Sequence, residues 1–443
     1  MKFANNLDDI INAFDLEPLD GKDLEDYYYN GTMANRMGDP LESPLDELER
    51  RCTDSTESNA HLLLGHRGCG KSTELNRLRD RLREKGHPVT IIKSKEVLDI
   101  LNLTYWDMMF VVSNALCTIA AERCALPDEL LDRLKDFFKD IEITEEISKT
   151  EALDIHGGIE AATPKLLSVL KFFAGVRSEL KTGYDRRTEI RERLKSRISD
   201  WIGYIKEIIT HLAGVSKQPI LIFEDLDKIP SPEAVWTIFN YGPLAQMPFP
   251  VIYTFPIDLS YDGKFNNLRD RFTPHILPLI KIRNLDGSEN KQGIEIIKNI
   301  VKMRADVKRL FVPEALDLLI DKTGGLLREL FSCIDHCAFR ALRRFEQDGG
   351  EARIDLTDAE RTLVRLRSDL SRMIEERQYA MLNEIYWNPK AGEIIKNRND
   401  LLELMQSRSV LEYNGERWCA VHPLIVDFLR NVGKLDCQEK KTA

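Results

Sequence analysis

Short runs of apolar residues alternate with segments of helical periodicity over the first two thirds of the chain. One such run, His61–Leu64, leads into a glycine-rich turn, and residues 73–85 then repeat leucines at helical spacing. Further strand-like runs follow at Val89–Ile92, Ile220–Phe223, Val251–Phe255 and Leu277–Ile282. The strands of a parallel sheet are buried on both faces, so their sequences are continuous apolar runs, and helical crossovers join them. The pattern therefore predicts an α/β fold, a parallel sheet flanked by helices.

Helical patterns dominate the remainder of the chain. Residues 127–215 carry two amphipathic stripes and are expected to form a helical insertion in the sheet domain. After Asn284 only helical patterns follow, until two short strands around Asn414-Gly415, a strong hairpin-turn signal. We therefore expect an N-terminal segment packing on the core at 1–58, a core at 59–284, an all-α lid at 285–375 and a winged-helix-like domain at 376–443.

Composition narrows the class of protein. The 443 residues are 43% hydrophobic and 31% charged, an ordinary globular balance, and the net charge of −10 gives no whole-surface attraction to DNA or anionic membranes. No uncharged apolar run approaches the ~18–20 residues that cross a bilayer. The first residues lack the apolar core of a signal peptide, and the scattered cysteines form no pair of CxxC motifs. We expect a soluble, cytoplasmic protein with no membrane partner.

A phosphate-binding loop is the strongest chemical signal. Residues 65–72 read G-H-R-G-C-G-K-S and fit G-x-x-x-x-G-K-[ST] in full, between a strand and a helix. The glycines let successive backbone N–H groups point at phosphate oxygens, beside the positive end of the helix dipole. Lys71 would reach the β- and γ-phosphates, Ser72 would hold Mg²⁺, and Thr73 would approach the α-phosphate. The motif predicts a P-loop NTPase whose nucleotide-binding residues are Gly65, His66, Arg67, Gly68, Cys69, Gly70, Lys71, Ser72 and Thr73.

A second strand supplies carboxylates. Residues 219–228 read P-I-L-I-F-E-D-L-D-K, so acidic side chains emerge at the carboxyl end of a buried strand, where open α/β sheets place their sites. Glu224 is assigned to the magnesium and Asp225 to activation of the attacking water, although the two roles are interchangeable on sequence grounds. The predicted metal ligands are therefore Ser72, Glu224 and Asp225.

With these motifs the chain resembles the AAA+/STAND group of P-loop ATPases, and residues 65–75 match its subgroup with G-H-R-G-x-G-K-S-T-E-L. That resemblance implies ATP as the nucleotide, a sensor-1 role for Thr254 and a sensor-2 arginine at Arg328. It also implies an arginine finger at Arg271, with Arg269 in reserve. The acidic pair reads Glu-Asp where the group more often has Asp-Glu, which leaves the catalytic carboxylate open. The insertion at 127–215 departs from a minimal core of the group.

The resemblance implies a switch or assembly ATPase that forms a homo-oligomer and acts with a separate effector protein, in bacterial antiviral defence or a mobile-element system. One alternative is a DNA-engaging ATPase similar to origin-recognition or transposition-regulator ATPases, using the hairpin domain and the basic stripe at 186–197. Another alternative is a scaffold that holds nucleotide without hydrolysing it.

Overall fold

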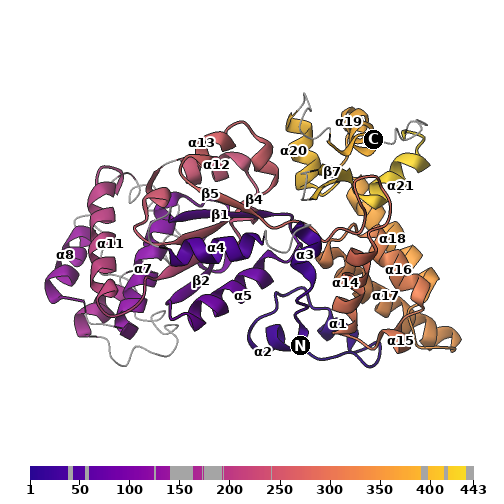
Figure 1. Ribbon diagram of the computed structural model, residues 1–443, viewed down its shortest axis with the longest axis horizontal. Coiled ribbons are helices and arrows are strands. Elements are labelled where there is room, and N and C mark those ends of the chain that lie inside the picture. The colour runs from indigo at the N-terminus through magenta and orange to yellow at the C-terminus, as the bar shows by residue number, and fades with distance from the viewer. Residues whose placement is uncertain are drawn as a thin grey trace.

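The computed structural model describes residues 1–37, 43–54, 59–123, 126–139, 163–171, 173, 192, 194–240, 242–390, 398–413 and 418–435. The molecule is elongated, with a sheet domain in the middle, a helical group at one end and further helices at the other (Figure 1). No helix among the described residues is both long and apolar enough to span a bilayer.

A five-stranded parallel sheet forms the centre of the molecule. Its order is β2-β3-β4-β1-β5, so β4 lies between the strand before the phosphate loop and the strand that carries the carboxylates. Every residue of β1, β3 and β4 is buried, which explains their continuous apolar sequences. The prediction of an α/β fold with a parallel sheet flanked by helices is confirmed. The strands are β1 (Ala60–Gly65), β2 (Val89–Lys93), β3 (Ile220–Glu224), β4 (Val251–Pro256) and β5 (Thr273–Ile276).

The expected strand at Leu277–Ile282 is wrong in position. The fifth strand is β5, a few residues earlier, and it tolerates Pro274 because it lies at the edge of the sheet. Residues 277–282 are buried but are not paired as a strand. The backbone of residues 277–282 is instead hydrogen-bonded by side chains of α3 (Thr32–Met37). Asn35 Oδ1 accepts from Lys281 N at 2.8 Å, and Arg36 donates to Pro278 O.

Helices cover the sheet and extend the domain. The insertion packs on α7 (Tyr105–Arg123) through a cluster of aromatic side chains, in which the Trp201 indole donates to Ser113 Oγ at 2.8 Å. Of the predicted basic stripe, Arg186, Arg187, Arg191 and Arg193 lie outside the described residues. Arg197 is described and stacks over the Phe137 ring. The helices are α4 (Pro44–Thr53), α5 (Lys71–Glu84), α6 (Ser94–Val97), α7 (Tyr105–Arg123), α8 (Asp128–Lys139), α11 (Ile198–Ala213), α12 (Pro232–Asn240) and α13 (Phe265–Arg269).

A second group of helices, which we call the lid, follows the sheet domain. It comprises α14 (Lys291–Lys302), α15 (Val307–Leu310), α16 (Pro313–Lys322), α17 (Leu327–Asp348) and α18 (Leu356–Ser371). The C-terminal part continues with α19 (Tyr379–Trp387), α20 (Arg398–Gln406), β6 (Val410–Tyr413), β7 (Trp418–Val421) and α21 (Pro423–Asn431). Strands β6 and β7 pair antiparallel from Tyr413 opposite Trp418, while the turn at Asn414-Gly415 lies outside the described residues.

The N-terminal residues divide between the two parts of the molecule. Helix α4 packs on the sheet domain, since its buried leucines share a hydrophobic cluster with the strands. Helix α1 (Ile10–Ala13) instead shares a hydrophobic cluster with the lid, because Ile10 and Phe14 bury their side chains there and Ala4 forms a bridge with Ala305. Helix α2 (Gly21–Tyr27) follows, so this segment runs from the lid to the sheet domain (Figure 1).

Candidate nucleotide-binding site

The phosphate loop joins β1 to α5 in the conformation that its glycines allow. Gly68 and Gly70 have φ of +87° and +100°, values that residues with a Cβ rarely adopt. Gly65 is confined in another way, because a Cβ there would lie 2.7 Å from Leu277 O. The loop therefore curls at the N-terminus of α5, where helix N–H groups and the helix dipole favour an anion.

Lys71 lies in the loop as a buried cation. Its Nζ donates to Gly65 O at 2.6 Å and His66 O at 3.0 Å, and forms an ion pair with Asp227 Oδ2 at 2.9 Å. Burial alone would lower the pKa of Lys71, but the Asp227 carboxylate outweighs it and the pKa is raised. The same pair lowers the pKa of Asp227 against the opposing effect of burial. Both groups are thus charged, and the pair holds the ammonium beside the loop.

Asp227 is a site residue that the sequence analysis did not assign. It follows β3 in the short turn Leu226–Lys228, and its backbone carbonyl accepts from Arg67 Nε at 3.2 Å and Nη2 at 3.0 Å. The available signal was its position two residues after Asp225 in E-D-L-D. Periodicity could not show that this third carboxylate, rather than the first two, pairs with Lys71.

Glu224 and Ser72 fit a magnesium site. Oε1 of Glu224 is buried without a hydrogen-bond partner among the described residues, and the Ser72 hydroxyl is close enough to the same carboxylate to oppose the rise in its pKa. Burial, with a smaller contribution from the Asp225 charge, raises the pKa of Glu224 to about 7. A buried carboxylate oxygen with spare acceptor capacity beside a hydroxyl suits a divalent cation that prefers oxygen ligands.

Asp225 and Thr254 shape the end of the neighbouring strands. Asp225 has φ of +67° and contacts Lys228 through its carboxylate, so its backbone turns sharply as it leaves β3. Thr254 of β4 accepts at Oγ1 from Leu226 N at 3.0 Å, which fixes that turn from the adjacent strand. Both residues line the same cavity as Lys71 and Ser72.

His66 and Cys69 point away from this cavity. The buried His66 ring accepts from Glu412 N, and Cys69 lies with its Sγ near Leu277 O while its carbonyl accepts from Arg36 Nη2 at 2.9 Å. Of the loop side chains, those of Arg67, Lys71, Ser72 and Thr73 line the cavity. His66 and Cys69 can therefore serve the site through their backbone only.

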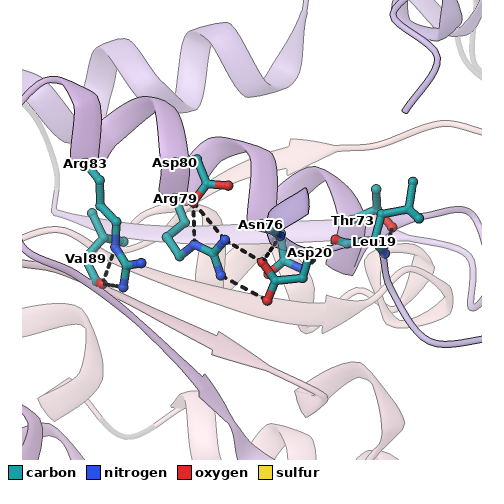
Figure 2. A network of polar contacts seen from close by, with 9 residues as sticks. Leu19, Asp20, Thr73, Asn76, Arg79, Asp80, Arg83 and Val89 are labelled. Carbon is teal, nitrogen blue, oxygen red and sulfur yellow. Dashed lines mark hydrogen bonds and ion pairs between the residues drawn. The ribbon is translucent and has the colours of Figure 1, made fainter. Parts of the chain in front are cut away.

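Residues 19 and 20 of the N-terminal segment pack against one side of α5, the helix that follows the phosphate loop (Figure 2). Thr73 Oγ1 accepts from Leu19 N at 3.3 Å, and Asn76 Nδ2 donates to Leu19 O at 2.8 Å. One turn further on, Arg79 forms an ion pair with Asp20 at 2.6 Å. Thr73 thus lies at the cavity, and its hydroxyl anchors the segment that leads to α2 and to Tyr27–Tyr29.

A cavity of about 670 Å³ joins these elements, within the range of small-molecule pockets. The lid contributes Arg328, whose backbone N lies 3.3 Å from Gly68 O and whose Nη2 donates to Leu16 O. Arg408, from the turn before β6, also lines the cavity and pairs with Glu329 at 3.2 Å. Arg271 does not line the cavity. Its Nη1 donates to Asn240 O at 2.8 Å elsewhere on the sheet domain.

Several solved structures are similar to this chain at low identity. The chain is similar to the Walker-type ATPase PABY2304 of Pyrococcus abyssi, at 15% identity, with 94% of this chain and 99% of that one covered and a TM-score of 0.41. It is also similar to the RuvB Holliday junction branch migration motor of Thermotoga maritima, at 12% identity, 96% and 99% coverage and a TM-score of 0.35. A third similar structure is the Aeropyrum pernix ORC1 protein in complex with DNA, at 10% identity, 88% and 92% coverage and a TM-score of 0.38. At these values the likeness carries no function over to this chain. No family model and no curated protein matches it.

Proposed function

We propose that this chain binds and hydrolyses ATP with Mg²⁺, as a switch or assembly ATPase of the AAA+/STAND kind. One observation carries the proposal: the P-loop lysine, the carboxylates of Asp225 and Asp227 and a lid arginine line one cavity. Ser72 lines the same cavity, and its hydroxyl influences the pKa of the Glu224 carboxylate. The choice of ATP rests on the sequence resemblance, since the described pocket does not by itself select a base.

Each residue takes a role from its position. Ser72 and Glu224 would hold Mg²⁺, which when bound would neutralise phosphate charge. Phosphate oxygens compete with Asp227 for the Lys71 ammonium, and Asp227 then becomes an acceptor beside the γ-phosphate. Asp225 faces the same cavity and orients the attacking water, with Asp227 as the second candidate for that role.

The lid supports a switching role. Arg328 comes from the N-terminus of α17 and approaches Gly68 of the loop, so a bound triphosphate would meet the lid and the sheet domain together. A guanidinium binds phosphate oxygens in a fork geometry, and the bound nucleotide would favour the closed lid. Loss of the γ-phosphate would then weaken that preference.

Assembly and partners are a further part of the proposal. Arg271 sits outside the cavity of its own chain, as a residue that completes a neighbour's site would. The C-terminal helices and hairpin fit a winged helix used for protein contact, with an effector supplied by a separate protein. Sizing the protein with and without a non-hydrolysable ATP analogue tests assembly, and an unchanged mass in all conditions would contradict it.

The central experiment measures ATP hydrolysis by wild type, Lys71→Ala and Asp225→Ala, each with and without Mg²⁺ and duplex DNA. We expect Mg²⁺-dependent turnover that both variants abolish, with Lys308→Ala, an exposed lid lysine, as the matched control. Stimulation by DNA would favour the DNA-engaging alternative. Tight ATP binding without turnover, lost in Lys71→Ala, would favour the scaffold, and no ATP binding at all would overturn the proposal.

A further inference from the structure

The nucleotide cavity has a second end, built from the N-terminal segment and the lid. Tyr27, Tyr28 and Tyr29 line it from the first side, and Ile300 and Phe331 from the second. Phe331 lies three residues after Arg328 on α17, so this end is almost one helical turn, a rise of about 4.5 Å, further along the lid than the contact with Gly68. With phosphates held at the loop, as the proposed function has it, the rest of a nucleotide can extend toward this aromatic end of the same cavity.

A buried arginine stands at this end. Arg304 follows α14 and is 5% exposed, yet it lines the cavity. Its Nη1 donates to Ala13 O at 3.1 Å and lies 3.4 Å from the Met1 thioether, and its guanidinium stacks over the Phe331 ring at 4.4 Å. Its Nε has no hydrogen-bond partner among the described residues, and no described carboxylate forms an ion pair with it.

This arrangement is costly for the protein alone. A guanidinium removed from water needs a counter-charge or a full set of acceptors, and one ring, one carbonyl and a weakly accepting thioether provide only part of that. Burial lowers the pKa of Arg304 to about 10, which reflects the same penalty, although the more distant charges of Asp23 and Asp15 oppose that shift. A methionine would fill this position without the penalty. The cation is therefore better explained by a ligand acceptor than by packing.

We propose that Arg304 is the residue that recognises the purine base, by donating a hydrogen bond to a ring nitrogen while the base lies among the aromatic side chains. A guanidinium only donates, so it reads acceptors such as the ring nitrogens and not the 6-amino group of adenine. The inference rests on the proposed nucleotide-binding function and adds the determinant of base recognition to it.

The test measures dissociation constants of the full chain for ADP, which avoids turnover, and for its 1-deaza, 3-deaza, 7-deaza and 2′-deoxy analogues. The variants are Arg304→Met, Arg304→Lys, Lys71→Ala and Arg309→Met. Arg309 is an exposed arginine of α15 and serves as the matched control. Thermal unfolding without nucleotide reports whether each variant is folded.

We expect Arg304→Met to bind ADP about 10- to 100-fold more weakly, the range for a lost hydrogen bond to a charged group. One deaza analogue should bind wild type correspondingly weakly, with no further loss in Arg304→Met. Arg304→Lys should recover part of the affinity. The unfolding temperature of ligand-free Arg304→Met should be unchanged or raised, because a buried unpaired charge is removed.

Two results would overturn the assignment while leaving nucleotide binding intact. One is ADP binding that weakens in Lys71→Ala but not in Arg304→Met. The other is an Arg304-dependent loss confined to the 2′-deoxy analogue, which would place the arginine on the ribose. If no deaza analogue weakens binding to wild type, the proposal fails whatever the variants do. Wild type that does not bind ADP would overturn the proposed function itself.

Discussion

His66, the second residue of the phosphate loop, accepts a hydrogen bond at Nε2 from the backbone amide of Glu412, 346 residues later in the chain, at 2.7 Å. Burial lowers the pKa of His66 to about 3, so the ring stays neutral and Nε2 remains an acceptor at physiological pH. The Glu412 carboxylate in turn accepts from Tyr261 OH at 2.7 Å. Strand β6 is therefore fixed to the loop and to the segment after β4, and the hairpin follows the position of the loop.

The first prediction concerns this contact. His66→Ala leaves the buried amide of Glu412 without its acceptor, so the free energy of unfolding should fall by about 1–3 kcal/mol. Hydrogen exchange of the Glu412 amide should accelerate. Urea denaturation and amide exchange measure the two effects. His211→Ala, at an exposed position of α11, should stay within about 0.5 kcal/mol of wild type, and equal losses in both variants would contradict the prediction.

The second prediction concerns the buried pair of Lys71 and Asp227. Asp227→Asn leaves the ammonium without its counter-charge, so the free energy of unfolding should fall by about 3–5 kcal/mol. In Lys71→Met/Asp227→Asn no buried charge of the pair remains unpaired, and much of that loss should be recovered. Urea denaturation of the single and double variants gives the coupling, and additive losses would show that the pair does not act as a unit.

The third prediction separates close approach from backbone strain in the loop. Gly68 has φ of +87°, and a Cβ there would lie 2.7 Å from Arg328 Cβ. Gly68→Ala should therefore displace α17 and weaken nucleotide binding at least tenfold, measured by titration with ADP. Gly349→Ala is the matched control, since Gly349 has φ of +70° and a Cβ there would meet no atom within 4 Å. It should cost about 1 kcal/mol of stability and leave nucleotide affinity unchanged.

The fourth prediction concerns pH. Burial lowers the pKa of His61 to about 3 and of His275 to about 4, from an ordinary value of 6.5. The two rings face each other across β1 and β5, with Glu47 and Arg51 of α4 nearby. Between pH 6.5 and the lower pKa values of the folded state, the unfolded chain binds more protons than the folded protein. The contribution of the two histidines to the free energy of unfolding is therefore fully present above pH 6.5 and is lost as the pH falls toward 4.

In His61→Val/His275→Val the free energy of unfolding should fall less steeply on acidification than in wild type. The slope against pH should be smaller by about 1 kcal/mol per pH unit or more. Urea denaturation at a series of pH values between 7 and about 4.5 measures the slope. His211→Ala should leave the slope unchanged. An unchanged slope in the double variant would mean that the pair is protonated, or exposed, in the folded state.

The sequence by itself determined the parts of the site that depend on neighbouring residues. The curl of residues 65–72, the placement of Lys71 and Ser72 at the start of α5 and the acidic turn after β3 follow from glycine conformation and strand burial, which are local properties. The helices at 291–302 and 313–322 likewise followed from their apolar periodicity. The fifth strand was misplaced because residues 277–282 are as apolar as a strand, while α3 rather than another strand bonds to their backbone.

Only the tertiary structure decided which distant groups meet. Three carboxylates stand at the end of β3 and just after it, and the pairing of Asp227 with Lys71 depends on how that turn crosses the loop from another strand. The contact of His66 with Glu412 and the position of Arg304 at the cavity require the hairpin and the lid to pack against the sheet domain. Local sequence fixes backbone conformation within a few residues, whereas the partners of a buried charge are set by packing between segments that are far apart in the sequence.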